Sequence, residues 1–290
     1  MEWIIRKIHE GLLIRTYLQR EHGFSRRMIK SIKFNGGNIL VNGTNQNVIY
    51  ELKDGDKLVV EFPQEKIGAY MEPEDTPLSI VYEDDAVLVL NKAAGMLSIP
   101  SLQQPTGTVA NALLGHYKNH DVTNTVHIVT RLDRDTSGLM LVAKNSYSHS
   151  RLSAFQKDGK VKRQYQAVVE GTPSDKKGVI NAPIERKEDS IIERMVREDG
   201  KQAITHYEVD REFAHYSLVR IQLETGRTHQ IRVHFSYVGH PLVGDTLYGG
   251  DDKWIGRQAL HCYALSFKHP ITNEDMHFQQ ELPQDMKQLL

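Results

Sequence analysis

The chain has 290 residues, with 36 lysines and arginines against 37 aspartates and glutamates, so its formal net charge is only -1. This length suits one large domain and a small one, and the 39% of hydrophobic and 25% of charged residues are typical of a globular protein with a real core. No apolar run approaches the roughly 20 residues that cross a bilayer, and residues 1–14 lack the order of a signal peptide, so we expect a cytoplasmic protein. The single cysteine, Cys262, excludes an internal disulfide and disfavours a structural zinc site.

A local basic patch lies near the start of the chain. Residues 22–50 contain no acidic residue, and Arg26, Lys30 and Lys33 are spaced by four and three, which would place them on one face of a helix. Ser25 can cap this helix. The predicted helix also contains the basic Arg27. Its apolar residues, Met28, Ile29 and Ile32, are expected to pack inward.

A small α/β unit is predicted around this helix. A short strand at 39–41, an Asn-Gly turn at 42–43 and a closing strand at 55–62 follow it. Residues 63–77 contain three prolines, mixed charge and little apolar periodicity, which is typical of a linker. We therefore predict a small domain at 1–65, a linker at 66–77 and a larger domain at 78–290.

The pattern of apolar and polar residues predicts that the larger domain consists mostly of strands. In the last of them, 216–223, apolar and polar residues alternate with the period of a sheet that has two unlike faces. One helix is expected from Thr108 to about Tyr117. A mixed, mainly antiparallel sheet with a few helices, an α+β fold, is predicted. Its strands are expected at 79–83, 87–92, 127–130, 139–143, 161–170, 203–209 and 216–223.

The stretch RLDRDTSGL, 131–139, lies in a predicted loop between two strands. Asp133 stands between Arg131 and Arg134, and cationic neighbours favour a charged carboxylate, the form that a nucleophile or base requires. Charged residues in a turn are more often simply solvated or loosely paired. This motif alone therefore leaves both interpretations open.

The stretch GRTHQIRVH, 226–234, follows a strand and opens a predicted helix. Arg227 is expected at the helix entrance, with Thr228 as a cap, while His229 and Arg232 share a face. The two histidines lack the carboxylate or cysteine partners of a metal site, so a core or surface role is favoured for them. The predicted buried stripe is Ile231, His234, Phe235 and Val238.

The stretch KRQYQAVVEG, 162–171, reads as a strand whose buried face carries Val161, Tyr165, Ala167 and Val169. Tyr165 could be an ordinary core tyrosine with a bonded hydroxyl. It could equally present an aromatic plane to a flipped base in a pocket. Periodicity does not separate these two roles.

Taken in order, these segments resemble the RluA-type family of pseudouridine synthases over nearly the whole chain. VLVLNKAAGM resembles the opening motif, RLDRDTSGL the catalytic loop, KRQYQAVVEG the tyrosine strand, and ETGRTHQIRVH with GHPLVGDTLYG the C-terminal signature. Residues 11–62 also look like the αL RNA-binding domain found in a small-subunit ribosomal protein. Two positions differ from the common form: Thr130 stands where many members have His, and Ala93 where NKPAG is common.

The resemblance implies an RNA pseudouridine synthase, an isomerase that converts uridine in structured RNA to pseudouridine. Ribosomal RNA is favoured over transfer RNA as its substrate. It implies that Asp133 is the essential carboxylate, that Tyr165 lies beside the target base, and that Arg227 pairs with Asp133. Arg131 would fill the space left by the extruded base, and the basic helix would bind RNA phosphates through Arg26, Arg27, Lys30 and Lys33. No cofactor, metal or membrane is expected, and the protein is expected to be a monomer.

Two other functions are compatible with parts of the pattern. Asp133 and Asp135 could form the carboxylate pair of a glycoside hydrolase, although residues two apart rarely flank a substrate from opposite sides. An RNA-binding assembly factor with an inactive pocket is the second alternative. The choice between attack of Asp133 on the sugar and removal of a sugar proton also stays open.

Overall fold

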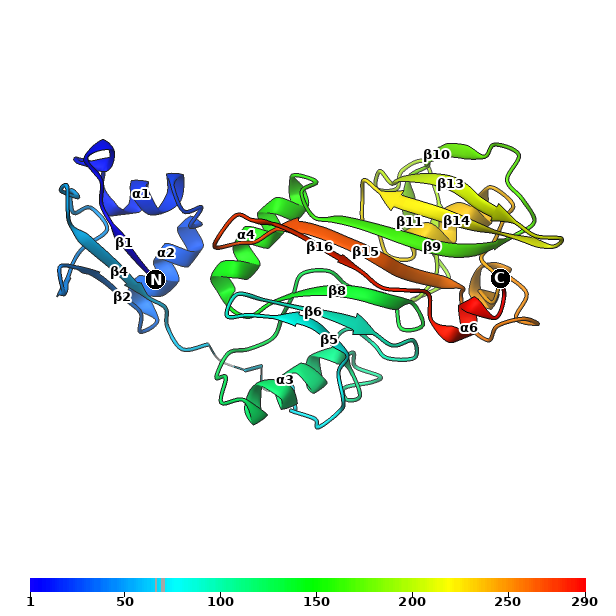
Figure 1. The fold of residues 1–290 in the computed structure, drawn as a ribbon, viewed down its shortest axis with the longest axis horizontal. Helices are drawn as coiled ribbons and strands as arrows, with labels where there is room; N and C mark the ends of the chain where they lie inside the picture. Colours follow the sequence, from blue (N-terminus) through cyan, green and yellow to red (C-terminus); the bar gives the residue numbers. More distant parts are fainter. Residues whose placement is uncertain (66, 69–70) are drawn as a thin grey trace.

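Two β-sheets of unequal size and a two-stranded ribbon organise the fold (Figure 1). The computed structural model describes residues 1–65, 67–68 and 71–290. The predicted linker at 66–77 therefore includes residues 66, 69 and 70, which lie outside the described residues. The predicted α+β class with a mixed, mainly antiparallel sheet is confirmed. In the part of the chain that the structure describes, no helix has the length and apolar character needed to cross a membrane.

The N-terminal unit is a four-stranded antiparallel sheet, in the order β1-β4-β2-β3, with two helices. Ser25 accepts a hydrogen bond from the Met28 N–H at 3.1 Å and caps α2 as predicted. Met28, Ile29 and Ile32 are buried, which leaves the basic side chains of this helix outside. The elements are β1 (Glu2–Ile4), η1 (Lys7–His9), α1 (Ile14–Arg20), α2 (Arg26–Phe34), β2 (Asn38–Val41), β3 (Thr44–Asn45) and β4 (Lys57–Glu61).

The larger sheet contains ten strands. Eight follow the order β10-β13-β14-β9-β15-β8-β6-β5, while β16 pairs with β15 and β7 pairs with β8. Among the strands that the described residues form in this sheet, β15 and β8 are the one parallel pair. The strands are β5 (Ile80–Glu83), β6 (Val87–Lys92), β7 (His127–Ile128), β8 (Ser137–Ala143), β9 (Lys162–Glu170), β10 (Lys177–Asn181), β13 (Ile204–Glu212), β14 (Tyr216–Leu223), β15 (Leu260–Lys268) and β16 (Asp275–Gln279).

The predicted strand at 127–130 is shorter than expected. It ends at Ile128, because the N–H groups of Val129 and Thr130 both donate to the carbonyl of Leu141 and so leave the regular ladder. Thr130, where many relatives of this pattern have His, is fully buried, and its hydroxyl accepts a hydrogen bond from the Leu141 N–H at 2.9 Å. The chain therefore enters the RLDRDTS loop from a fixed point on β8.

The larger sheet has two unlike faces, as alternation along its strands requires. Tyr165 on β9, Ile221 on β14 and Tyr207 on β13 are register partners and share one face, where the Tyr207 ring lies 5.5 Å from that of Phe235. The opposite face is covered at one end, where Val168 and its neighbours pack against the C-terminal helix. The helices associated with this sheet are α3 (Val109–Asn119), α4 (Ser146–Lys157), α5 (Gln230–Tyr237) and α6 (Gln284–Lys287).

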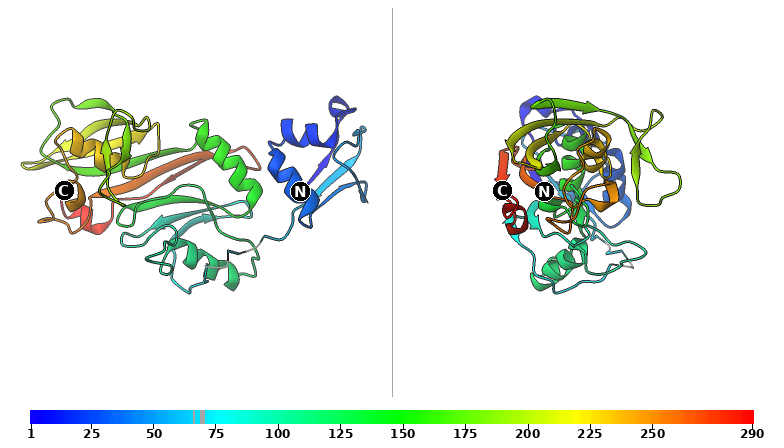
Figure 2. Two further views of the ribbon diagram at one scale, coloured as in Figure 1. Left: turned by 180° about the vertical axis from the view of Figure 1, so that it is seen from behind. Right: turned by 90° about the vertical axis from the view of Figure 1, so that its right-hand side faces the viewer.

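The N-terminal unit contacts the larger domain through α4, which lies next to it in the left-hand view of Figure 2. The Tyr147 ring of α4 lies 4.9 Å from the Phe24 ring, and its hydroxyl donates to the His22 carbonyl at 2.9 Å. Glu65 lies 2.7 Å from His127 Nε2. A small aromatic and polar contact thus fixes the N-terminal unit at the α4 end of the molecule.

Candidate active site

The loop from Arg131 to Thr136 joins β7 to β8 and carries the carboxylate that the sequence singles out. The Asp133 side chain is 27% exposed, so it can be reached from solvent while most of its surface is packed. Arg131 and Arg134 are exposed. Arg134 pairs with Asp135 at 3.2 Å and not with Asp133, so the guanidinium nearest to Asp133 comes from elsewhere in the chain.

The segment from Lys92 to Ser98, which contains the end of the opening motif, bonds the backbone of this loop. The Lys92 ammonium is fully buried and donates to three carbonyls, among them that of Arg134 at 2.7 Å. Burial lowers the pKa of Lys92 to about 8. Ser98 Oγ donates to the Leu132 carbonyl at 2.7 Å and accepts from the Leu132 N–H at 3.2 Å. The residues on both sides of Asp133 are thereby tied to one segment.

The far end of the loop is held by β15 and the residues before it. Arg257 donates to the Asp135 carbonyl at 3.0 Å. At the start of β8, Gly138 has a φ of 116°, and a Cβ there would lie 2.3 Å from the Cys262 carbonyl oxygen. Only glycine permits this approach of the two strands. The loop that carries Asp133 therefore starts and ends at fixed backbone positions.

The partner of Asp133 is Arg232 of α5. Arg232 Nη1 lies 3.5 Å from Asp133 Oδ2, while its Nε and Nη2 each make a 2.7 Å hydrogen bond to the buried carboxylate of Asp245. Burial alone would lower the pKa of Arg232, but the hydrogen bonds and charge of Asp245, with the charge of Asp133, raise it. The guanidinium also lies 4.9 Å from the centre of the Tyr248 ring. One face of the Asp133 carboxylate is thus set against a fixed cation.

His229 forms a second contact beside Asp133. Its Nε2 lies 3.9 Å from Asp133 Oδ2, and its Nδ1 lies 2.8 Å from the Tyr248 hydroxyl, which accepts the Arg194 N–H at 2.9 Å. With Tyr248 donating to Nδ1, the ring proton is on Nε2 and faces Asp133. Burial lowers the pKa of His229, so the ring is a neutral dipole beside the carboxylate.

The entrance to α5 differs from the prediction. His229, not Thr228, occupies the N-cap position, without a side-chain cap and with a left-handed backbone at φ 58°. The buried Gln230 side chain instead holds the turn before the helix, because its Oε1 accepts from the Arg227 N–H at 3.0 Å. The predicted stripe is confirmed for Ile231, His234 and Phe235, whereas Val238 is 41% exposed because the helix ends at Tyr237.

His234 is a satisfied core histidine, as favoured from the sequence. Its Nδ1 bonds Thr205 at 2.8 Å, and its Nε2 bonds the Ala182 carbonyl at 2.9 Å. Among the described residues, no group of three or more His, Cys, Asp and Glu side chains is arranged to hold a metal ion.

The expected pairing of Arg227 with Asp133 is wrong. Arg227 is exposed and its Nε donates to the Gln202 carbonyl at 3.0 Å. The reason is its position in the turn that precedes α5, whereas Arg232 lies on the helix and faces the loop. The sequence did place His229 and Arg232 on one face, and that spacing was the signal for the correct residue. Asp245 lies in the GHPLVGDTLYG part of the C-terminal signature, and no spacing in the sequence indicated that it bonds Arg232.

Tyr165 is 4% exposed and belongs to the hydrophobic cluster of the large sheet, on the predicted buried face of β9. Burial is the main cause that raises the pKa of its hydroxyl, and the charge of Asp133 adds to the effect. The hydroxyl therefore stays protonated at neutral pH. Its register partner on β15, Cys262, is also buried, which raises the pKa of that thiol to about 12.

The remaining predicted residues lie away from this cluster. Arg26, Arg27, Lys30 and Lys33 are exposed on α2 of the N-terminal unit, and none of them forms an ion pair within the described ranges of the chain. Lys33 Nζ lies 5.1 Å from the centre of the Phe34 ring. These four side chains are free to meet a ligand at the N-terminal unit, and α2 lies away from β8, the strand that follows the loop of Asp133 (Figure 1).

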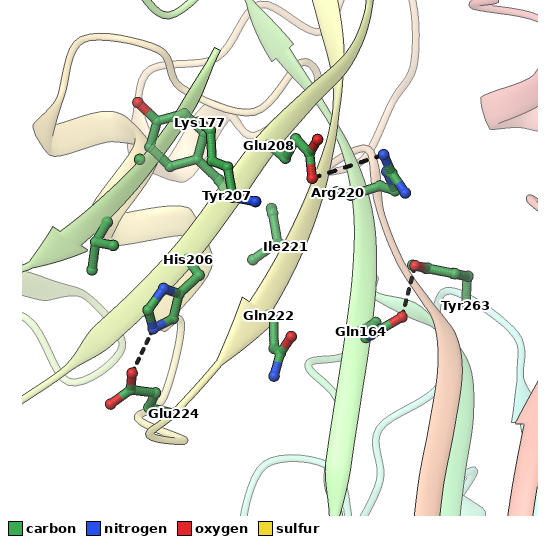
Figure 3. Close-up of a pocket in the computed structure, with 12 residues that line it drawn as sticks. Gln164, Lys177, His206, Tyr207, Glu208, Arg220, Ile221, Gln222, Glu224 and Tyr263 are labelled. Carbon is green, nitrogen blue, oxygen red and sulfur yellow. Dashed lines mark hydrogen bonds and ion pairs between the residues drawn. The ribbon is translucent and has the colours of Figure 1, made fainter. Parts of the chain in front are cut away.

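A hollow of about 580 Å³ on the larger sheet is not part of this cluster. Figure 3 shows its polar side chains standing on β9, β13 and β14. Gln164, which lines it, precedes Tyr165 on β9, so this side chain projects from the face of the sheet opposite to Tyr165. Several of its charged side chains pair with one another, as in the 2.5 Å contact of His206 with Glu224 and the 3.9 Å contact of Arg220 with Glu208. It is a solvated sheet face.

Asp133 of the loop, Arg232 of α5 and Asp245 form one charged cluster that a loop and a helix hold in place. The sequence model of the RNA pseudouridylate synthase family matches residues 86–237, which include Asp133, Tyr165 and Arg232. The chain belongs to this family and is an RNA pseudouridine synthase, an isomerase that acts on RNA.

Curated relatives match nearly all of the chain. An "Uncharacterized RNA pseudouridine synthase YjbO" of Bacillus subtilis (strain 168) is 54% identical over 270 residues, covering 93% of this chain and 95% of the relative. A "Ribosomal large subunit pseudouridine synthase D" of Yersinia pestis is 40% identical over 266 residues, covering 87% and 82%. These matches confirm the predicted RluA-type family.

The fold is shared with solved structures. The chain named "Human RNA Pseudouridylate Synthase Domain Containing 1" superposes with a TM-score of 0.59 at 27% identity, covering 73% of this chain and 86% of that one. "Human RNA Pseudouridylate Synthase Domain Containing 4" gives a TM-score of 0.57 at 22% identity, covering 72% and 90%.

Proposed function

We propose that this enzyme isomerises uridines of large-subunit ribosomal RNA, with Asp133 as the reacting carboxylate. The observation that carries the mechanism is the contact of Asp133 with an arginine that is itself fixed by Asp245. The observation that carries the substrate is the set of relatives named for the large ribosomal subunit, at 37–43% identity.

The reaction breaks the bond between uracil N1 and the ribose, turns the base and rejoins it through C5, with no net change of redox state. Asp133 either attacks the sugar or removes a sugar proton, and both routes start from the charged carboxylate. Arg232 supports that form and aims it, since its guanidinium cannot move without breaking two hydrogen bonds to Asp245. The C5 proton leaves after the base is rejoined.

The role proposed for the buried Tyr165 is to stack its ring on the uracil while the base is detached from the sugar. A stacked uridine cannot reach Asp133, so it must first leave its helix, at a cost of about a few kcal/mol. Arg131, exposed next to Asp133 on the same loop, is placed to enter the space that the base vacates. Phosphate contacts of Arg26, Arg27, Lys30 and Lys33 on the N-terminal unit would offset part of that cost.

The hydrolase alternative fits the geometry less well. Asp135 pairs with Arg134, and its carbonyl accepts from Arg257, so it acts as part of the loop's support and not as a second reacting carboxylate. An inactive assembly factor would have no need of the ordered Asp133–Arg232–Asp245 contact. The site therefore favours isomerisation.

Pseudouridine mapping of total RNA from a strain that lacks this protein tests both parts of the proposal. We expect a large-subunit ribosomal RNA site to lose its pseudouridine, the wild-type gene to restore it, and Asp133→Asn to leave it unmodified. Loss confined to transfer RNA would refute the proposed substrate. Turnover of purified Asp133→Asn above about a hundredth of wild type would refute the role of the carboxylate, because such roles are commonly worth at least about 10²-fold.

A further inference from the structure

A cavity in the N-terminal unit has no part in the site described above. It measures about 420 Å³ and lies among β1, η1 and the end of α1. Its lining combines aromatic rings with one cationic and one anionic side chain. These residues are Trp3, His9, Tyr17, His22, Arg6 and Glu21.

The rings form a connected wall. Trp3 and His22 lie 4.4 Å apart at 31°, and Tyr17 meets His22 edge-on at 5.0 Å. His9 meets the other side of Tyr17, also at 5.0 Å. Tyr17 is buried, whereas Trp3, His9 and His22 are half-buried, so ring surface remains open to a ligand.

Packing of the domain core does not account for this cluster by itself. His9 Nδ1 and His22 Nε2 are buried without a hydrogen-bond partner among the described residues. Buried polar atoms are nearly always bonded when their only role is packing, because each unpaired one costs free energy. Burial lowers the pKa of His22, so its ring is a neutral aromatic surface.

We propose that this cavity binds an unpaired nucleobase of the RNA, and specifically one with an exocyclic amino group. Aromatic rings stack on any base, and single-stranded bases are what proteins usually read in RNA. Glu21 supplies an acceptor for the amino group, as carboxylates do for cytosine N4. Arg6, which also lines the cavity, supplies a cation for the phosphate attached to the bound nucleoside. Its charge disfavours binding of a cationic ligand in this cavity.

This inference rests on the RNA substrate of the family and not on the role of Asp133. It gives the N-terminal unit a site that selects a nucleotide at a distance from the reacting uridine. The basic helix would supply sequence-independent contacts to phosphates, and this cavity would supply a base-specific one.

The two tryptophans of the chain allow a direct test on the full-length protein. With both labelled as 5-fluorotryptophan, Trp3 reports on the cavity by ¹⁹F NMR, and Trp254 serves as an internal control assigned with Trp254→Phe. Cytidine 5′-monophosphate should shift the Trp3 resonance saturably and leave Trp254 unmoved. Uridine 5′-monophosphate should bind about tenfold more weakly, since it lacks the amino group, and ribose 5-phosphate should cause no shift.

Two matched variants test the role of the carboxylate. Glu21→Ala should abolish the preference for the cytidine nucleotide, while Glu51→Ala, also exposed on the N-terminal unit, should retain it. Asp133→Asn should give the wild-type shifts, so failure of this inference is separate from failure of the proposed mechanism. No Trp3 shift with either nucleotide, or an equal shift with ribose 5-phosphate, would overturn base binding. Equal affinity for both nucleotides would overturn the selection by Glu21.

Discussion

Arg232 reaches Asp133 at 3.5 Å while two of its nitrogens bond the Asp245 carboxylate at 2.7 Å. The three side chains come from α5, from the loop before β8 and from the segment after α5. Asp245 has 1% of its side chain exposed and Arg232 has 8%. Because Nε and Nη2 of Arg232 are bonded to the buried Asp245, its Nη1 remains available, and this atom faces Asp133.

The first prediction is that Arg232→Lys lowers kcat on the order of 10²-fold. A lysine keeps the charge but has one compact donor group, so it cannot bond both oxygens of Asp245 and also face Asp133. Single-turnover kinetics on a uridine-containing RNA measures the effect. The Michaelis constant should change little, because the contact is to the reacting group and not to the RNA backbone.

Arg227→Lys is the matched control, since both arginines flank the same helix start. Its side chain is exposed and bonds only the Gln202 carbonyl, so we expect a change in kcat below about threefold. If Arg227→Lys were the more damaging variant, the assignment of Arg232 as the partner of Asp133 would be incorrect.

Lys92 leads to a second prediction, on stability. Lys92→Met keeps the volume of the buried side chain but removes donors from three carbonyls, so unfolding free energy should fall by about 3 kcal/mol. Urea denaturation followed by Trp254 fluorescence in a Trp3→Phe background reports on the catalytic sheet. The Arg134 carbonyl loses a bond, so kcat should fall as well.

Lys118→Met provides the comparison for this experiment. Lys118 is exposed on α3, and substitution there should change stability by less than about 0.5 kcal/mol. A Lys92→Met protein as stable as Lys118→Met would show that the three carbonyls find other donors, and that Lys92 does not organise the catalytic loop.

Local patterns in the sequence were enough to predict several elements. Ser25 as a cap and the buried side of α2 depend on residues within one helical turn. The buried face of β9 follows from strict alternation. The helix α4 was not predicted, because its SYSHSRLSAFQK sequence mixes serines and histidines and has no clear apolar stripe.

The site was only partly predictable, because its contacts join distant segments. Asp133 was identified through the family resemblance of the chain's motifs, but its partner depends on how the turn before α5 folds. There, His229 takes a left-handed backbone that moves Arg227 outward and leaves Arg232 inward. Nothing near Asp245 in the sequence signals its bond to Arg232. The central strand β15 was also not predicted. Its position between β9 and β8 depends on contacts with segments that are distant in the sequence.

A third prediction concerns metal ions. The isomerisation has no redox step and needs no external nucleophile, and Asp133 with Arg232 can supply the charge that it requires. Activity on a short stem-loop RNA, folded in potassium salt, should therefore persist in excess EDTA and without added nucleotide. Loss of turnover under chelation, restored by one metal, would contradict this expectation.

The last prediction concerns Arg26, Lys30 and Lys33 on α2, which we propose contact RNA phosphates. All three are exposed, and none forms an ion pair with a described residue. If each neutralises one phosphate, its change to Ala should weaken binding and reduce the salt dependence of the affinity. The slope of log affinity against log salt should become shallower by about 0.7 to 0.9 per residue.

Turnover at saturating RNA should barely change in these three variants, because a phosphate contact made equally in the ground and transition states raises the Michaelis constant without slowing the chemical step. Lys118→Ala, exposed on α3 of the other unit, is the control for loss of a surface charge and should leave the slope unchanged. Affinity measured at several salt concentrations gives the answer. Unchanged slopes in all three variants would mean that α2 does not touch the phosphate backbone, so that the RNA is held by the catalytic sheet and by other surfaces of the N-terminal unit.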